Sequence, residues 1–220
     1  MNDQSSLRAL ASQVDTSAIC DAAKETRVMS TALRCRSASP VLFGPAFTVR
    51  CQDDIFGLVL AIEKASPGDV LVVDGGGRET ALAGELFARA ALARGIAGII
   101  VDAAYRDLAY IATCELPVYS RHTSPMAGTA QRLGVLNEPV SCGGVTVRPG
   151  DIVIADHDGI IVLDAATAEA TLRAAVQVKV AEARVVQGLD AGQPLRALLN
   201  VEEHAARLAA SEPTSLRITA

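Results

Sequence analysis

A strand–turn–helix–strand pattern in the first half of the chain restricts the possible folds more than any other feature. Residues 70–73 (Val-Leu-Val-Val) form a continuous hydrophobic run of strand length, as expected for a strand buried on both faces. Glycines follow at 75–77. An alanine-rich helix is predicted next over 84–94, with Gly95 as its stop, and a second apolar run follows at 96–101. These segments predict a βαβ unit, whose two strands pair in parallel through a right-handed crossover.

Further elements are predicted on both sides of this unit. We expect helices over 15–24, 55–64, 165–188 and 194–208, and strands over 43–51, 145–147, 151–155 and 159–163. Asp15 is predicted to cap the first helix and Gly188 to close the long one. The last three strands are predicted to be consecutive and antiparallel, with a hairpin turn at Asp158-Gly159. The pattern favours a mixed sheet covered by helices, with C-terminal helices that are available to pack on a neighbouring subunit.

Composition limits the class of protein. The 220 residues are 50% hydrophobic, and no low-complexity linker divides them, so one domain is predicted over 1–220. The net charge of −5 and the absence of a Lys/Arg block argue against a nucleic-acid partner. The five cysteines are far apart and contain no CxxC pair, so we expect reduced, mostly buried thiols. No signal peptide or membrane-spanning run is found, which predicts a cytoplasmic protein with no membrane partner.

Two glycine-containing segments could receive a ligand. The turn at 75–77 places flexible backbone at the carboxyl end of a buried strand, where ligands of α/β proteins commonly bind. Its spacing fits neither GxGxxG nor GxxxxGK[ST], so nucleotide binding is disfavoured, and a tight turn explains it equally well. Gly84-Glu85-Leu86 begins the next predicted helix, where unpaired N–H groups suit a substrate carboxylate. Glu85 is as readily explained as an ordinary first-turn acid.

Arg106-Asp107 is the most informative charged pair. It follows a strand predicted to end at Asp102, and it supplies a cation and a hard oxygen ligand at one edge of the sheet. Mg²⁺ or Mn²⁺ needs few protein carboxylates when water and substrate complete its octahedron. The alternative is an ordinary solvated ion pair. His122 lies in a polar loop at 119–125 that could line a site, whereas the acids around His157 are better explained by turn formation.

These pieces, in this order and spacing, resemble the RraA-like / 4-hydroxy-4-methyl-2-oxoglutarate (HMG) aldolase family. The matching pattern is Gly75-Gly76, Ala81-x-x-Gly84-Glu85-Leu86, Gly95-x-x-Gly98, Asp102-x-x-x-Arg106-Asp107, Pro117-Val118-Tyr119, Cys142-Gly143-Gly144, Pro149-Gly150-Asp151 and Asp158-Gly159. The chain departs from it at Ala103-Ala104, where members commonly have glycine. The resemblance implies a layered α-β-β-α fold with mixed sheets, a core over about 15–188 and a helical extension over 189–220.

The resemblance also implies roles for particular residues. Asp107 would hold the metal, and Arg106 would contact the substrate carbonyl oxygen as a catalytic residue. Gly84, Glu85 and Leu86 would bind the substrate carboxylate through their N–H groups, and Glu85 would reach the metal through water. Glu182, on the long C-terminal helix, matches a catalytic acid that an adjacent subunit contributes. Such proteins are expected to be homotrimers or homohexamers with sites between subunits.

The function that the resemblance implies is a metal-dependent (class II) pyruvate aldolase. It would use Mg²⁺ or Mn²⁺ to cleave a 4-hydroxy-2-oxo dicarboxylic acid into pyruvate and a second 2-oxo acid, and it would also decarboxylate oxaloacetate. The alternative is a non-catalytic regulator of ribonuclease activity, the other branch of the family. That branch is shorter and is expected to lack the acid at Glu182, so the long helix favours the enzyme.

Overall fold

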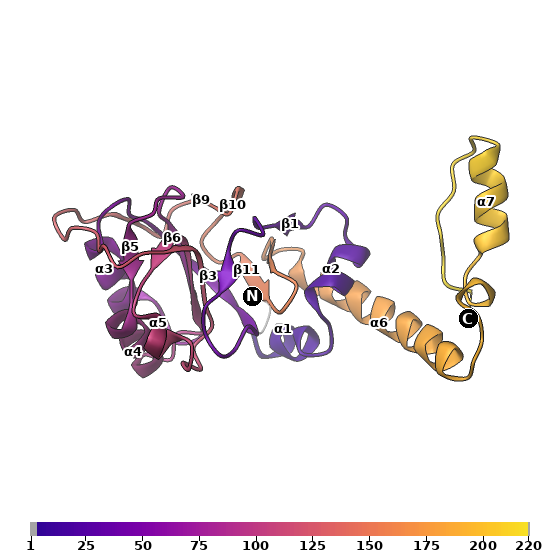
Figure 1. Ribbon diagram of the computed structural model, residues 1–220, viewed down its shortest axis with the longest axis horizontal. Helices are drawn as coiled ribbons and strands as arrows, with labels where there is room; N and C mark the ends of the chain where they lie inside the picture. The colour runs from indigo at the N-terminus through magenta and orange to yellow at the C-terminus, as the bar shows by residue number, and fades with distance from the viewer. Residues whose placement is uncertain (1–3, 220) are drawn as a thin grey trace.

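The chain, in a computed structural model, is described over residues 4–219 (Figure 1). Its strands are β1 (Arg27–Val28), β2 (Arg34–Cys35), β3 (Leu42–Arg50), β4 (Val70–Asp74), β5 (Ala81–Ala83), β6 (Gly98–Tyr105), β7 (Val118–Thr123), β8 (Val135–Leu136), β9 (Val140–Cys142), β10 (Val145–Val147), β11 (Ile152–Ala155) and β12 (Ile160–Leu163). Its helices are α1 (Gln4–Ala11), α2 (Thr16–Ala22), α3 (Phe56–Lys64), α4 (Glu85–Ala93), α5 (Leu108–Ile111), α6 (Ala168–Asp190), the 3₁₀ helix η1 (Leu195–Ala197) and α7 (Val201–Ala209).

One mixed sheet forms the centre of the molecule. Its main path runs β1-β12-β11-β3-β4-β6-β7-β2, with β5 beside β6 and β8 beside β3. The predicted βαβ unit is confirmed, because β4 and β6 pair in parallel with α4 between them in sequence. β3 and β7 extend this parallel part on either side, whereas β11, β12 and β1 are antiparallel. The mixed character of the sheet is therefore confirmed.

Three hydrophobic clusters show that the sheet curls into the layered α-β-β-α arrangement. In β4, Leu71 and Val73 face α3 and α4, while Val70 and Val72 face the opposite side, as the two-residue period of a strand requires. That opposite side packs on β9, β11 and β12 in a cluster built from strands. The third cluster lies between the outer face of β11 and β12 and helices α1, α2 and α6. The predicted fold class is thus confirmed.

β6 is longer than the sequence predicts. The strand does not end at Asp102 but continues to Tyr105, because β5 pairs in parallel with its last part. Ala103 and Ala104 are fully buried in this strand, and a Cβ added to Gly75 would come within 2.5 Å of the Ala103 Cβ. The two methyl groups that depart from the glycine pattern therefore lie in a packed sheet and not in a turn.

The predicted run of three antiparallel strands is wrong at its first member. β11 and β12 do pair around the turn at Asp158 and Gly159, and Asp156 accepts a hydrogen bond from the Asp158 N–H within it. β10 instead pairs with β9. The chain turns at Gly150, which has a φ of +81° and donates its N–H to the Ala46 carbonyl. This turn sends β11 alongside β3.

The C-terminal helices also differ from the prediction. α6 continues past Gly188 to Asp190. Gly188 does not end the helix; it makes room for the Leu198 side chain, whose Cδ2 would lie 2.6 Å from a Cβ added to Gly188. The left-handed turn comes later, at Gly192 with a φ of +81°. The single helix predicted over 194–208 is divided into η1 and α7, with Asn200 between them.

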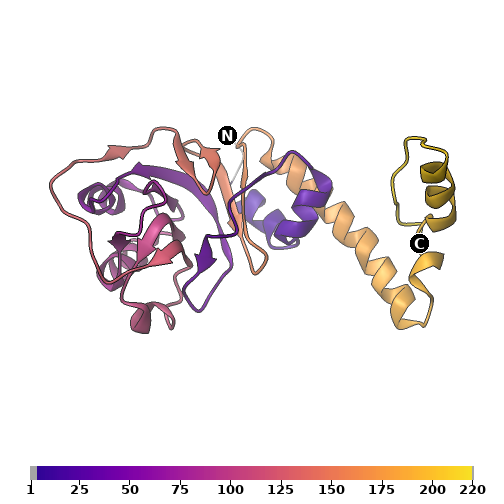
Figure 2. The same cartoon turned by 45° about the horizontal axis from the view of Figure 1, so that its top comes forward.

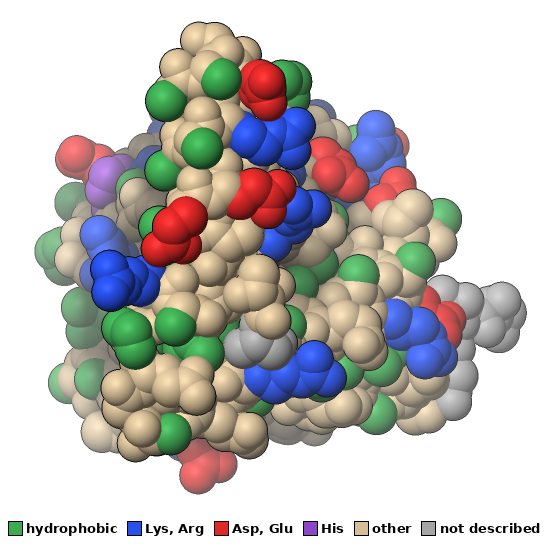
Figure 3. Space-filling view, turned by 90° about the vertical axis from the view of Figure 1, so that its right-hand side faces the viewer, with side chains coloured by type: hydrophobic (Ala, Val, Ile, Leu, Met, Phe, Trp, Pro, Cys, Tyr) green, Lys and Arg blue, Asp and Glu red, His purple; other side chains and the backbone are tan. Residues whose placement is uncertain are grey.

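The C-terminal half of α6 projects away from the sheet and carries α7 at its far end (Figures 1 and 2). Only its first half packs on the body, through Ala168, Leu172 and Ala175 against α1 and α2. Acidic, basic and hydrophobic side chains are interspersed on this end of the molecule (Figure 3). Packing of these helices on a neighbouring subunit stays a prediction. Over residues 4–219, no helix has the length and apolarity needed to cross a bilayer.

Candidate functional site

A cavity of about 260 Å³ opens where β6 and β7 end and α5 begins. Because both strands are parallel, their carboxyl ends meet at the same edge of the sheet, which is the usual ligand position in α/β folds. The residues that line it are Tyr105, Arg106, Asp107, Leu108, Thr123, Ser124 and Pro125. The cavity thus contains the Arg-Asp pair singled out in the sequence.

Asp107 is held in an unusual position. Its backbone is left-handed, with a φ of +59° and a ψ of +41°, a conformation that costs most non-glycine residues roughly 1–3 kcal/mol but that Asp tolerates better. Its Oδ2 accepts a hydrogen bond of 3.0 Å from the Glu85 N–H and lies 3.6 Å from the Arg106 Nε. A carboxylate therefore already occupies the anion-binding end of α4, in keeping with the dipole of that helix.

Gly84 allows this close approach. Its backbone is extended, so no left-handed φ demands glycine there. A Cβ on this residue would instead overlap the Asp107 carboxylate and come within 2.8 Å of the Arg106 Cγ. Below it, the buried Tyr105 hydroxyl donates a hydrogen bond of 3.3 Å to the Gly84 carbonyl. Burial raises the pKa of Tyr105 far above its ordinary value, so this hydroxyl stays protonated.

The Glu85 side chain turns away from Asp107. Its Oε1 accepts a hydrogen bond of 2.8 Å from the Nε of Arg89, and the Arg89 guanidinium lies 4.2 Å from the centre of the Tyr110 ring. This arrangement ties α4 to α5, so the side chain contributes to packing while the backbone N–H faces the site. Leu86 is 74% exposed, and its side chain is directed to solvent beside the start of the helix.

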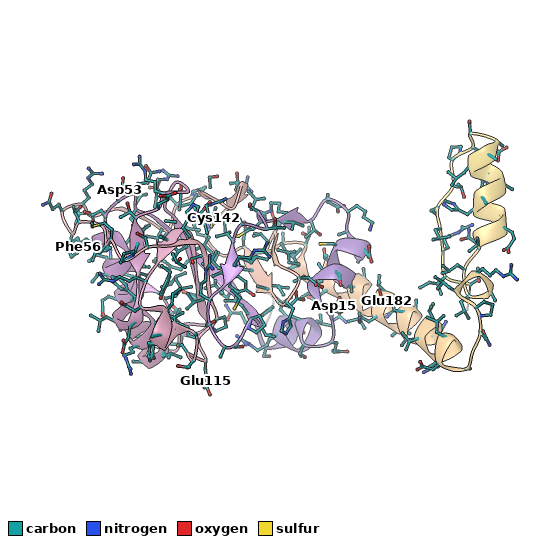
Figure 4. The ribbon with its side chains drawn as sticks, in the orientation of Figure 1. Asp15, Asp53, Phe56, Glu115, Cys142 and Glu182 are labelled. Carbon is teal, nitrogen blue, oxygen red and sulfur yellow. The ribbon has the colours of Figure 1, made fainter. Side chains whose placement is uncertain are left out.

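Five of the six predicted site residues therefore lie together: Gly84, Glu85, Leu86, Arg106 and Asp107. The sixth, Glu182, does not lie with them. It sits on α6, near Asp15 and far from α4 and α5 (Figures 1 and 4). The roles proposed for all six stay predictions, and Glu182 can reach an Asp107 only in another copy of the chain.

Glu182 is held by a small ionic network. The Lys179 Nζ lies 3.0 Å from the Glu182 Oε2 and 2.8 Å from the Asp15 Oδ2. Asp15 also caps α2 by accepting from the Ala18 N–H, as predicted. The hydrogen bond from Lys179, followed by that from Ala18, lowers the pKa of Asp15 to about 2. The network fixes Glu182 on the half of α6 that leaves the body.

The glycine turn after β4 lies beside the site and is closed by polar contacts. Gly77 has a φ of +69° and donates its N–H to the Asp102 carbonyl. The buried Asp102 carboxylate pairs with Arg121 and accepts from the Gly143 N–H. His122 does not line the cavity; its Nε2 contacts the Gly77 carbonyl at 3.2 Å. It belongs to β7, so the polar loop predicted at 119–125 is largely a strand.

The sequence predicted that the segment 119–125 could line a site but singled out only His122 in it, whereas Thr123, Ser124 and Pro125 line the cavity. The signal was present, because polar residues follow a strand that begins with the apolar pair Val118-Tyr119. The sequence does not show that this strand, β7, pairs in parallel with β6. That pairing brings the carboxyl end of β7 to the cavity.

A family model described as RraA-like (Aldolase/RraA) matches residues 16–162. This match covers most of the chain and contains every residue that lines the cavity. The chain belongs to the RraA-like family. The matched region ends before α6, so the helix that carries Glu182 lies outside it.

Individual RraA-like relatives carry different kinds of name, among them aldolase, ribonuclease inhibitor and methyltransferase. A protein of Halalkalibacterium halodurans named as a candidate 4-hydroxy-4-methyl-2-oxoglutarate aldolase is 35% identical over 164 residues, 74% of this chain and 78% of the relative. The structure of the RNA-processing inhibitor RraA from Thermus thermophilis is 30% identical, with a TM-score of 0.63 over 67% of this chain and 91% of that one. Streptomyces coelicolor RraAS2, described as an unusual member of the RNase ES inhibitor RraA family, is 27% identical, with a TM-score of 0.75 over 85% of this chain and 99% of that one.

The Streptomyces match weakens the prediction that the regulators of this family are shorter than this chain. It reaches over more of the chain than the Thermus match does. An RraA-like protein described by ribonuclease inhibition can therefore be nearly as long as this chain, and length alone does not separate enzyme from regulator.

The RraA-like site suits a hard divalent ion with few protein ligands. Over residues 4–219, no group of three His, Cys, Asp or Glu side chains is arranged to hold a metal, which argues against a closed structural site. Asp107 is the one carboxylate among the residues that line the cavity. Mg²⁺ or Mn²⁺ accepts such a site, because water and substrate oxygens supply its remaining ligands. The chain's own residues thus fit a metal held by Asp107.

Proposed function

We propose that this RraA-like protein is a divalent-metal-dependent aldolase. It cleaves a 4-hydroxy-2-oxo dicarboxylic acid to pyruvate and a second 2-oxo acid, and it decarboxylates oxaloacetate as a side activity. The observation that carries the proposal is the contact of the Asp107 carboxylate with both the first N–H of α4 and Arg106. Relatives named as candidate aldolases of this substrate class support it.

The substrate would bind between α4 and Arg106. The N–H groups of Glu85 and Leu86 at the start of α4 would receive its carboxylate, since the first N–H groups of a helix have no partner within it. The Glu85 N–H now donates to Asp107, so it would exchange this bond for the substrate carboxylate when Asp107 binds the metal. Arg106 lies close enough to place its guanidinium on the 2-oxo oxygen. Mg²⁺ or Mn²⁺ on Asp107 would supply a Lewis acid to polarise that carbonyl.

Cleavage follows from this placement. A base removes the proton of the C4 hydroxyl, the C4 carbonyl forms, and the electron pair of the C3–C4 bond moves into C3 and the 2-oxo group. Arg106 stabilises the negative charge that develops on the 2-oxo oxygen, and protonation of C3 releases pyruvate. Glu182 of a second copy is the proposed catalytic acid–base group. Glu85 of the same chain is the alternative, and its side chain would have to leave Arg89 to act. Such a site needs at least two copies of the chain, and the assembly that we propose is a homotrimer or homohexamer.

The test is pyruvate release from 4-hydroxy-4-methyl-2-oxoglutarate and from oxaloacetate, with Mg²⁺, with Mn²⁺ and with EDTA. Asp107→Ala should lower both activities by roughly a thousandfold or more, because it removes the metal ligand. Asp158→Ala, which removes an exposed acid from the β11–β12 turn, is the matched control and should leave both rates unchanged.

The second candidate function is a regulator that binds a ribonuclease, and the two RraA structures favour it. A regulator acts through its surface, so its inhibition of a ribonuclease would survive Asp107→Ala. Absence of pyruvate release from either compound with metal present, together with inhibition by both the unaltered protein and the variant, would decide for the regulator.

A further inference from the structure

The cavity has a second polar wall at the carboxyl end of β7, beside the end of β6 that leads into Arg106 and Asp107. Thr123 lies beside Tyr105 in the parallel register, and the Ser124 N–H donates a hydrogen bond of 3.1 Å to the Tyr105 carbonyl. The backbone of this wall is therefore bonded to Tyr105, the residue directly before Arg106 and Asp107 in the sequence. Its position does not depend on the side chains of Thr123 or Ser124.

Two residues with hydroxyl groups line the cavity on this wall, together with apolar residues. Thr123 and Ser124 supply the hydroxyls, and Leu108 and Pro125 supply the apolar surface. The Ser124 Oγ accepts a hydrogen bond of 3.3 Å from the Met126 N–H. A hydroxyl that accepts in this way still has its own proton to donate. The wall thus offers donors for oxygen atoms beside surface that suits a methyl or methylene group.

We propose that Thr123 and Ser124 determine specificity by contacting the substituents on the fourth carbon of the substrate. The inference rests on the proposed function, in which α4, Arg106 and Asp107 take up the first two carbons. Within this chain, Thr123 and Ser124 are then the polar lining residues of the cavity of about 260 Å³ that are left for the rest of a small acid. This wall selects compact 2-oxo acids whose fourth carbon bears a hydroxyl or carboxylate together with a small alkyl group.

Comparison of two substrates tests the inference. In 4-hydroxy-4-methyl-2-oxoglutarate the fourth carbon carries a hydroxyl, a methyl and a carboxylate, whereas in oxaloacetate it is the carboxylate that leaves as CO₂. A hydrogen bond to that leaving carboxylate would stabilise the ground state and would not speed decarboxylation. The two activities therefore depend differently on the wall.

The variants are Ser124→Ala and Thr123→Val, with Ser124→Thr as the conservative control that keeps a hydroxyl. We expect Ser124→Ala and Thr123→Val each to lower kcat/KM for the aldol substrate by about tenfold, chiefly through KM. Oxaloacetate decarboxylation should stay within about twofold of the unaltered protein. Ser124→Thr should recover most of the aldol activity.

Each other outcome is decisive. An equal loss on both substrates would mean that the wall only supports the structure, and no loss on either would mean that it makes no contact; both results overturn the inference. An unaltered protein inactive on both substrates would overturn the proposed function itself, and the inference with it. A selective loss of aldol cleavage supports both.

Discussion

At the scale of single residues, the site depends on how closely Gly84 and Asp107 approach each other. The carboxylate can reach the N–H of Glu85 only because nothing projects from the Gly84 Cα. The left-handed backbone of Asp107 gives the carboxylate that direction. Neither residue alone would place a carboxylate oxygen at the start of α4.

Gly84→Ala should therefore reduce both activity and stability. The added methyl would displace the Asp107 carboxylate and press on Arg106. We expect pyruvate release to fall by roughly a hundredfold, and the free energy of unfolding to fall by about 1–3 kcal/mol, as measured by urea denaturation. Gly159→Ala is the control, since nothing lies within 4 Å of a Cβ at that position. Equal effects of the two substitutions would contradict the account.

The sequence predicted the positions of the site residues around α4 and β6, because these residues either begin a recognisable helix or follow a recognisable strand. Arg106 and Asp107 come after a buried strand, and Gly84 to Leu86 begin a helix. The turning of the Glu85 side chain to Arg89 could not be predicted, because a first-turn acid has the same sequence pattern whichever way it points. The wall at Ser124 depends on strand pairing, which one sequence does not specify.

At the scale of elements, α2 and α6 are joined by the contacts of Asp15. This residue caps α2 and accepts a hydrogen bond from Lys179 of α6. These bonds lower its pKa from 3.8 to about 2. A depressed carboxyl pKa contributes stability above the unfolded value, and that contribution is lost as the pH falls through the folded value.

Asp15→Ala should thus destabilise the protein by about 1 kcal/mol at pH 7, the usual effect of losing an N-cap. The difference from the unaltered protein should shrink as the pH falls from about 4 toward 2, when Asp15 becomes protonated in both states. Urea denaturation over this range measures it. Asp21→Ala is the control on the same helix, because Asp21 pairs with exposed Lys24 in a surface contact. A difference that does not change with pH would contradict this explanation.

Most elements were predictable because their burial is visible in local composition. The first four residues of β4 are apolar, and α4 ends two residues before Gly95, which has a φ of +71°. The errors arose where a distant segment decides the outcome. β5 lengthens β6, and Leu198 packs against the helix at Gly188. No local pattern identifies such partners.

At the scale of the whole molecule, the layered body and the projecting α6 are distinct parts of one chain (Figure 1). Exposed hydrophobic side chains, Val180, Val186 and Leu189, lie on the projecting half of α6. On the proposed function, this half meets the site of another copy. Light scattering should then give a mass of about three or six times the 22.8 kDa of the chain. A mass equal to one chain, with full aldolase activity, would exclude a site shared between copies.

The separation of Asp107 from Glu182 has a consequence for mixtures of chains. In a ring of identical subunits, each site would take its metal ligand from one chain and its acid from the next. A protein with Asp107→Ala and one with Glu182→Ala would each be inactive alone. Co-assembled in equal amounts, they would restore about a quarter of the sites, because a chain that kept Asp107 would by chance neighbour one that kept Glu182. Two defective copies of such a gene could thus rescue each other within one cell.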